Sequence, residues 1–219
     1  MTKRCRLLCS LLMLCVSGCT ALGVAAYKLK PPETIHPVYT ALGGQSVGVM
    51  VWADRGIRID WPTAQLDMAN AIESKLMDEA KHAAKKDKLL SGTTFPVQPA
   101  SIVRYQKDHP EIEAQPILEV APRLGVSRLI YVELQDFATR SDMSVDLYRG
   151  IAVADVRLIE IDNGQARVAF EKTDVRASYP PKAPQEGMPG VGDVKTYAGT
   201  VDAFGTEVVH LFVPYQVEE

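Results

Sequence analysis

Apolar residues recur along the chain in two spacings, one typical of strands and one of helices. Residues 47–52 form an apolar run rich in β-branched side chains, which predicts a strand covered on both faces. Residues 54–60 read as a polar loop, with Asp60 as the cap of the next helix. Helical spacing then places six apolar residues on one face: Leu66, Ala69, Ile72, Leu76, Ala80 and Ala83.

The middle of the chain continues with short elements. Residues 95–97 predict a weak strand, residues 100–107 and 116–124 predict two helices, and residues 127–134 predict another apolar strand. Strands that alternate with helices are typical of an α/β layer with parallel pairing.

The second half has a longer period-2 pattern. Residues 147–161 place Ala152, Ala154, Val156 and Leu158 on one face, and the turn 162–164 leads into a return strand from residue 166. A Pro/Gly-rich loop at 178–194 precedes a closing helix whose apolar residues are Val201, Phe204, Val208, Leu211 and Phe212. The predicted fold class is α/β: a single mixed sheet of about five strands with helices packed on it, a long β-hairpin and a closing C-terminal helix.

The first residues follow neither pattern. Lys3, Arg4 and Arg6 precede ten residues, 7–16, of which only Ser10 is polar. Ten helical residues rise only about 15 Å, half of the hydrocarbon thickness of a bilayer, so this segment indicates a removable signal peptide over residues 1–18. Its removal leaves 21 basic and 27 acidic residues, a net charge of −6.

Val16-Ser17-Gly18-Cys19 resembles the lipobox of bacterial lipoproteins. The resemblance implies cleavage between Gly18 and Cys19, a diacylglycerol thioether on Cys19, and a further acyl chain such as palmitate on its new amine. Two or three acyl chains hold a protein stably on a membrane. Thr20, where inner-membrane lipoproteins tend to carry Asp, implies the outer membrane, with the body of the protein facing the periplasm.

Cysteine usage agrees with an oxidising envelope. All four cysteines, Cys5, Cys9, Cys15 and Cys19, lie in the first 19 residues. A disulfide or metal cluster is disfavoured because three of them would be removed with the signal peptide.

Residues 19–45 are predicted as a lipidated tether, although 39–42 could instead pack on the domain. The domain spans 46–213, and 214–219 form a tail.

The lipobox, the strand 47–52, the long helix, the join 124–132, the hairpin at 163–164 and the closing helix together resemble the curli-secretion lipoprotein superfamily and the amino-terminal domain of TolB. The resemblance covers about residues 46–213. It implies an assembly or transport role at the outer membrane rather than catalysis.

The candidate chemistry is sparse. His36, His82, His109 and His210 lack metal-ligand spacing, so we expect no metal, and without a nucleophile elbow or phosphate-binding glycine loop we expect no catalytic residues and no cofactor. A net charge of −3 and a pI near 5.9 disfavour a nucleic-acid-binding protein, and the lysines at 81–88 are interpreted as a solvated helix end.

The candidate binding loop follows the first strand and contains Trp52, Asp54, Arg55, Arg58, Asp60 and Trp61. This loop could bind a polar ligand or a peptide. Alternatively, its charged residues are solvated and its two tryptophans cap the core.

The sequence therefore predicts a lipid-anchored, non-catalytic binding or scaffold component of an outer-membrane assembly or transport system. Its expected partners are the membrane, through the lipid, and another envelope protein. One alternative is an oligomeric export-channel component of the curli-secretion type. A second is an envelope hydrolase with an unrecognised site, which a polar cleft near Asp54 with a carboxyl of raised pKa would favour.

Overall fold

The computed structural model describes residues 33–86, 88–141 and 144–216, so the signal segment and the lipobox lie outside the described residues. The chain divides into two compact units, of which the larger spans residues 36–214. In the smaller unit, β1 (Thr34–Ile35) pairs antiparallel with β6 (Tyr215–Gln216).

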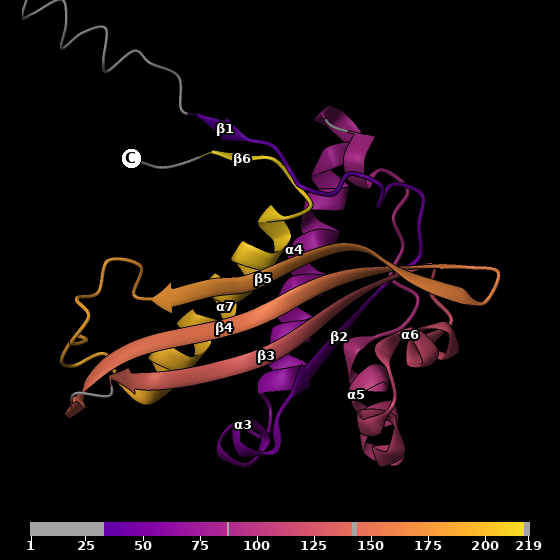
Figure 1. Ribbon diagram of the computed structural model, residues 1–219. Helices are drawn as coiled ribbons and strands as arrows, with labels where there is room; N and C mark the ends of the chain where they lie inside the picture. The colour runs from indigo at the N-terminus through magenta and orange to yellow at the C-terminus, as the bar shows by residue number, and fades with distance from the viewer. Residues whose placement is uncertain (1–32, 87, 142–143, 217–219) are drawn as a thin grey trace, which may run out of the picture. The chain divides into compact units, whose positions relative to one another are not determined.

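A four-stranded mixed sheet forms the centre of the larger unit (Figure 1). Its strands are β2 (Val47–Ala53), β3 (Arg128–Ser141), β4 (Ser144–Asp162) and β5 (Gln165–Tyr179), in the order β2-β3-β4-β5. β2 is parallel to β3, and the pairs β3–β4 and β4–β5 are antiparallel. The predicted α/β class, with a mixed sheet and a closing helix, is confirmed.

Helices cover both faces of the sheet. Against one face pack α4 (Ala64–Lys86) and α7 (Asp193–His210), whose buried residues include Leu76 and Phe204. Against the other pack α5 (Pro99–Asp108), η2 (Pro110–Ala114), α6 (Ile117–Val120) and η3 (Ala121–Leu124). The remaining helical segments are α3 (Arg55–Asp60) and η1 (Lys88–Leu90). The long helices and the short ones thus bury different faces.

The helix α7 lies unusually close to the sheet. A Cβ on Gly150 of β4 would lie 1.7 Å from the Oγ1 of Thr200, and one on Gly199 would lie 2.5 Å from the ring of Tyr179. Both distances are far below van der Waals contact, so these positions require glycine for the observed packing.

Several predicted elements differ from the structure. The predicted loop 54–60 is mostly the short helix α3, because Asp54 Oδ1 accepts a hydrogen bond from Ile57 N (2.9 Å) and caps it. Asp60 ends α3 and does not cap α4, which begins at Ala64. The predicted strand 95–97 is absent from this described stretch, where Thr94 makes only an isolated bridge to Ser46.

The antiparallel part of the sheet is also longer than predicted. β3 continues to Ser141 and forms a hairpin with β4, in addition to the predicted hairpin of β4 and β5. The Pro/Gly-rich segment between β5 and α7 is joined to β4 by reciprocal backbone hydrogen bonds of 2.9 Å between Tyr148 and Met188. Among the described residues no helix has the length and apolar character needed to cross a membrane.

The end of the predicted tether packs on the domain, as the alternative for 39–42 anticipated. Leu42 is 1% exposed within the larger core. Tyr39 donates a hydrogen bond from its hydroxyl to Glu160 Oε1 (2.7 Å) and accepts one from Arg128 Nε (3.2 Å). Because Glu160 and Arg128 are themselves buried, this network fastens the segment to the ends of β3 and β4.

Candidate functional site

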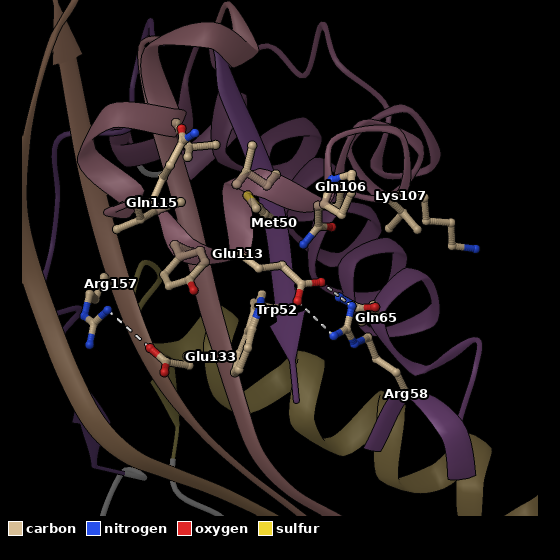
Figure 2. Close-up of a pocket in the computed structure, with 16 residues that line it drawn as sticks. Met50, Trp52, Arg58, Gln65, Gln106, Lys107, Glu113, Gln115, Glu133 and Arg157 are labelled. Carbon is tan, nitrogen blue, oxygen red and sulfur yellow. Dashed lines mark hydrogen bonds and ion pairs between the residues drawn. The ribbon is translucent and has the colours of Figure 1, made fainter. Parts of the chain in front are cut away.

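A cavity of about 570 Å³ opens on the face of the sheet that the short helices cover (Figure 2). The sheet contributes side chains from β2, β3 and β4, and the rest come from α3, α4, α5, η2, α6 and from Gln115, which lies between η2 and α6. Its size is typical of ligand sites. Its principal polar and aromatic residues are Trp52, Arg58, Gln65, Gln106, Glu113, Gln115, Tyr131, Glu133 and Arg157.

Two ion pairs neutralise the carboxylates of the cavity. Arg58 of α3 pairs with Glu113 of η2 in a fork, with Nη1–Oε1 and Nη2–Oε2 distances of 2.5 and 3.2 Å. Arg157 Nη1 lies 3.3 Å from Glu133 Oε2, and its Nε binds Glu171 (2.7 Å). Figure 2 shows Trp52 between the two pairs, with Lys107 directed away from them. The cavity wall therefore carries little unbalanced charge.

Two glutamines cap the open edge of the sheet. β2 is an edge strand, and its Val51 carbonyl accepts hydrogen bonds from Gln65 Nε2 (2.9 Å) and Gln106 Nε2 (3.1 Å). These bonds orient both amides, because each nitrogen faces the carbonyl. The amide oxygen of Gln106 is consequently left for another partner.

Three buried polar atoms at this cavity have no hydrogen-bond partner within the part of the chain that the structure describes. They are the donor Arg58 Nε and the acceptors Gln106 Oε1 and Gln115 Oε1. An unsatisfied buried polar group costs about 1–3 kcal/mol, and native proteins rarely leave one without a reason. Three such atoms at one cavity favour a bound molecule that supplies donors and an acceptor.

Aromatic residues form the apolar part of the wall. Trp52 is half-buried, and Tyr131 is buried beneath the guanidinium of Arg157, which lies 6.0 Å from its ring centroid. Burial, with a smaller effect of Glu133, raises the pKa of Tyr131 to about 12, so its hydroxyl stays protonated at neutral pH. The cavity thus pairs flat apolar surface with neutral hydrogen-bonding groups.

The structure separates the residues of the predicted binding loop. Trp52 and Arg58 line the cavity, whereas Asp54 caps α3 and Arg55 and Asp60 are exposed outside the lining. Trp61 packs against Phe137 and Tyr197 with ring centroids 5.3 and 5.5 Å apart, beside the core under α4 and α7. The two tryptophans therefore contact different cores and form no common rim.

Sequence reasoning missed most of the cavity. Arg58 and Glu113 are 55 residues apart, and only the packing of η2 beside α3 joins them. A signal did exist on the strands: Tyr131 and Glu133 share a face of β3, and the register sets Tyr131 opposite Arg157. Charged residues on an otherwise apolar strand face can indicate a solvent-accessible binding site.

The described residues contain no group of three His, Cys, Asp or Glu side chains that could hold a metal ion. His82 Nδ1 lies 2.6 Å from the carbonyl of Asp78, and His109 Nδ1 lies 2.9 Å from Glu111. The carboxyl whose pKa is raised to about 7 is that of Glu73, which lies between α4 and α7 and not near Asp54. The carboxyl of raised pKa therefore lies outside the cavity, whose own carboxylates, Glu113 and Glu133, are paired with arginines.

Comparison with known proteins gives only distant similarities. No protein-family model matches the chain, and no curated protein matches it. A PelC dodecamer structure from Paraburkholderia phytofirmans is 11% identical, with a TM-score of 0.42, covering 84% of this chain and 98% of that one. Hypothetical protein CT253 from Chlamydia trachomatis is 14% identical, with a TM-score of 0.40 and coverages of 77% and 97%. Lipoprotein GNA1162 from Neisseria meningitidis is 13% identical, with a TM-score of 0.31 and coverages of 61% and 80%.

Proposed function

We propose that the chain is a bacterial envelope lipoprotein, anchored to the outer membrane through acyl chains on Cys19 and facing the periplasm. It acts as a non-catalytic binding component of an assembly or transport system, and it binds a segment of another envelope protein in the cavity beside Trp52. The observation that carries the binding role is the set of three unpaired polar atoms at that cavity.

The charge balance of the cavity supports binding rather than catalysis. Glu113 and Glu133 are each held by an arginine, which fixes the carboxylate in place and occupies at least one of its oxygens. A hydrolase would need a nucleophile or base free to move a proton, and neither Glu113 nor Glu133 meets that need. This is the support for a role without turnover.

A peptide segment fits the chemistry of the wall. Each peptide unit carries one N–H donor and one carbonyl acceptor, which matches the mixture of Gln106 Oε1, Gln115 Oε1 and Arg58 Nε. The aromatic and aliphatic lining suits an apolar side chain on the same segment. Because the ion pairs already balance the charges, we expect the bound segment to be uncharged.

Photo-cross-linking in the source bacterium tests the proposal. A photoreactive amino acid replaces Lys107, which lies at the cavity and is exposed, in the otherwise natural full-length chain. We expect one envelope protein to be cross-linked. Gln106→Leu should reduce that product about tenfold, the effect of losing one buried hydrogen bond of about 1.4 kcal/mol. Cys19→Ala should abolish it by releasing the chain from the membrane.

Ile59→Ala serves as the control, because Ile59 is 66% exposed on α3 and does not line the cavity. Equal cross-linking by the Gln106→Leu variant and the wild type would contradict a partner in the cavity. Equal cross-linking by Cys19→Ala would contradict the anchor.

A second candidate is the oligomeric export component, and the edge strand β5 favours it. β5 is 15 residues long, and Val168 on it is 41% exposed, so its outer edge could pair with another copy. Mass photometry of the detergent-extracted protein tests this candidate. Rings that dissociate on Val168→Lys would support it, and a monomer would count against it.

A further inference from the structure

A second hollow, of about 550 Å³, lies in the groove between α4 and α7, separate from the cavity beside Trp52. Asp67, Glu73 and Met77 line it from α4, and Tyr197, Val201 and Asp202 line it from α7. The groove therefore combines three carboxyl groups with an apolar floor. Met77 is 39% exposed, which leaves the groove open to a molecule in solution.

Glu73 is the unusual residue of this groove. Its side chain occupies the apolar stripe of α4, one turn after Ala69 and one turn before Leu76, and the residue is only 9% exposed. Its Oε2 is buried and has no hydrogen-bond partner among the described residues. A buried carboxylate is normally paired, so Glu73 lacks a partner that its environment requires.

The neighbouring groups are already engaged with one another. Asp67 Oδ2 accepts a hydrogen bond from the hydroxyl of Tyr197 (2.7 Å), and Lys75 Nζ lies 2.6 Å from Asp202 Oδ1. Burial is the sole cause that raises the pKa of Glu73, and no nearby cation offsets it. Within this part of the structure, the chain supplies no counter-ion to Glu73.

We infer that the groove receives the side chain of a lysine on a partner protein, with Glu73 as its counter-ion. A lysine ammonium is a single point charge on a long methylene stem, and its stem could lie along Met77 and Val201. Because Oε2 of Glu73 is buried, the carboxylate cannot offer both oxygens to the two-pronged guanidinium of an arginine, and a single ammonium suits it better. This inference concerns a different surface from the proposed function and does not depend on it.

Nuclear magnetic resonance of the full-length chain in detergent tests the chemistry of the groove. The probe is n-butylammonium, which reproduces the lysine side chain beyond Cα, and n-butanol is its uncharged counterpart. We expect butylammonium to shift the methyl signals of Met77 and Val201 and to lower the pKa of Glu73 by at least half a unit. Glu73→Gln should weaken binding at least fivefold.

Glu79→Gln provides the matched control, because it makes the same change at an exposed position of α4 outside the groove. Butanol binding as tightly as butylammonium would overturn the inference. So would unchanged butylammonium affinity in the Glu73→Gln variant, or binding lost equally in the Glu79→Gln variant.

A carbodiimide cross-link identifies the source of the lysine, because this reagent joins a carboxylate directly to an amine that touches it. We expect a cross-linked peptide pair in membranes of the source bacterium that joins Glu73 to a lysine of a different protein. Mixing isotopically labelled and unlabelled chains shows whether a second copy supplies the lysine. A link between copies, or no link at Glu73 at all, would overturn the partner assignment.

Discussion

The two faces of the sheet are covered in different ways. The face under α4 and α7 holds the larger core, with fully buried side chains such as Leu76, Phe204 and Phe212, and α7 approaches the sheet closely at Gly150 and Gly199. The face under α5, η2 and α6 holds the smaller core and is interrupted by the cavity. Both helices of the first face are long, and the cover of the second is made of short pieces.

The difference indicates how stability and binding are divided. The close packing of α7 on the sheet leaves no room for a ligand between them, whereas the short helices leave a cavity against the sheet with buried polar atoms that packing does not satisfy. We therefore expect substitutions under α7 to change stability most, and substitutions at the cavity to change binding with little loss of stability.

The largest expected effect is that of Phe204→Ala. Phe204 is fully buried under α7, and its truncation should lower the free energy of unfolding by about 3–5 kcal/mol. Ile112→Ala, beside the cavity, should cost about 2 kcal/mol, because Ile112 is smaller and the adjacent space allows the site to relax. Urea unfolding of both variants measures the contrast. Equal losses would contradict the division between the two faces.

Glu73→Gln should stabilise the protein at high pH. The pKa of Glu73 is raised to about 7 in the folded state, above its ordinary value of 4.5, so the folded state holds the proton more tightly. Wild-type stability should therefore fall as the pH rises from 4.5 through 7. The variant should be more stable by about 3 kcal/mol at pH 8.5 and equal to wild type below pH 4.5. Thermal unfolding across this range, with Glu79→Gln as control, would contradict the account if the difference did not depend on pH.

Tyr39→Phe should cost about 1.5 kcal/mol, because it removes hydrogen bonds to the buried carboxylate of Glu160 and from Arg128. The phenyl ring keeps its edge contact with Phe212, at 6.4 Å between centroids, so the loss isolates the hydroxyl. Amide hydrogen exchange should show faster exchange over residues 38–46. An unchanged exchange rate there would mean that the Tyr39 hydroxyl does not fasten this segment to the sheet.

Gln106→Leu should have the smallest effect on the fold, a gain of about 1 kcal/mol, because it removes a buried unpaired oxygen while Gln65 still donates to the Val51 carbonyl. Gln65→Leu loses the same kind of hydrogen bond and removes no buried unpaired atom, so it should bring no gain. Chemical denaturation compares the two. A destabilised Gln106→Leu variant would indicate that its oxygen is already satisfied.

The sequence predicted those parts of the fold that rest on local patterns. The apolar run of β2 and the stripes of α4 and α7 each bury one continuous face, so their periodicity is visible in the chain. α3 was missed because Gly56 and the polar residues around it resemble a loop, and only the Asp54 cap signals the helix. The end of β3 was missed because Phe137 and Ala138 are the only apolar residues of 135–141, too few to show a strand period in the sequence.

The sites were harder to predict than the fold. Trp52 and Arg58 were found because they follow the first strand, but their partners Glu113, Gln106 and Arg157 come from elements distant in sequence. Glu73 could have been found, since helical spacing alone places this carboxylate beside Ala69 and Leu76. Residues that are paired from distant elements can be recognised only in the tertiary structure, whereas a charged residue in an apolar stripe is visible in the sequence.

The covalent anchor comes before both sites, because acylation at Cys19 would hold the cavity and the groove in the envelope. The direct measurement is the intact mass of the protein extracted from membranes of its source bacterium. We predict a chain that begins at Cys19 and carries the added mass of a diacylglyceryl group with a further acyl chain. A chain that begins at Met1 with an unmodified thiol would contradict the account.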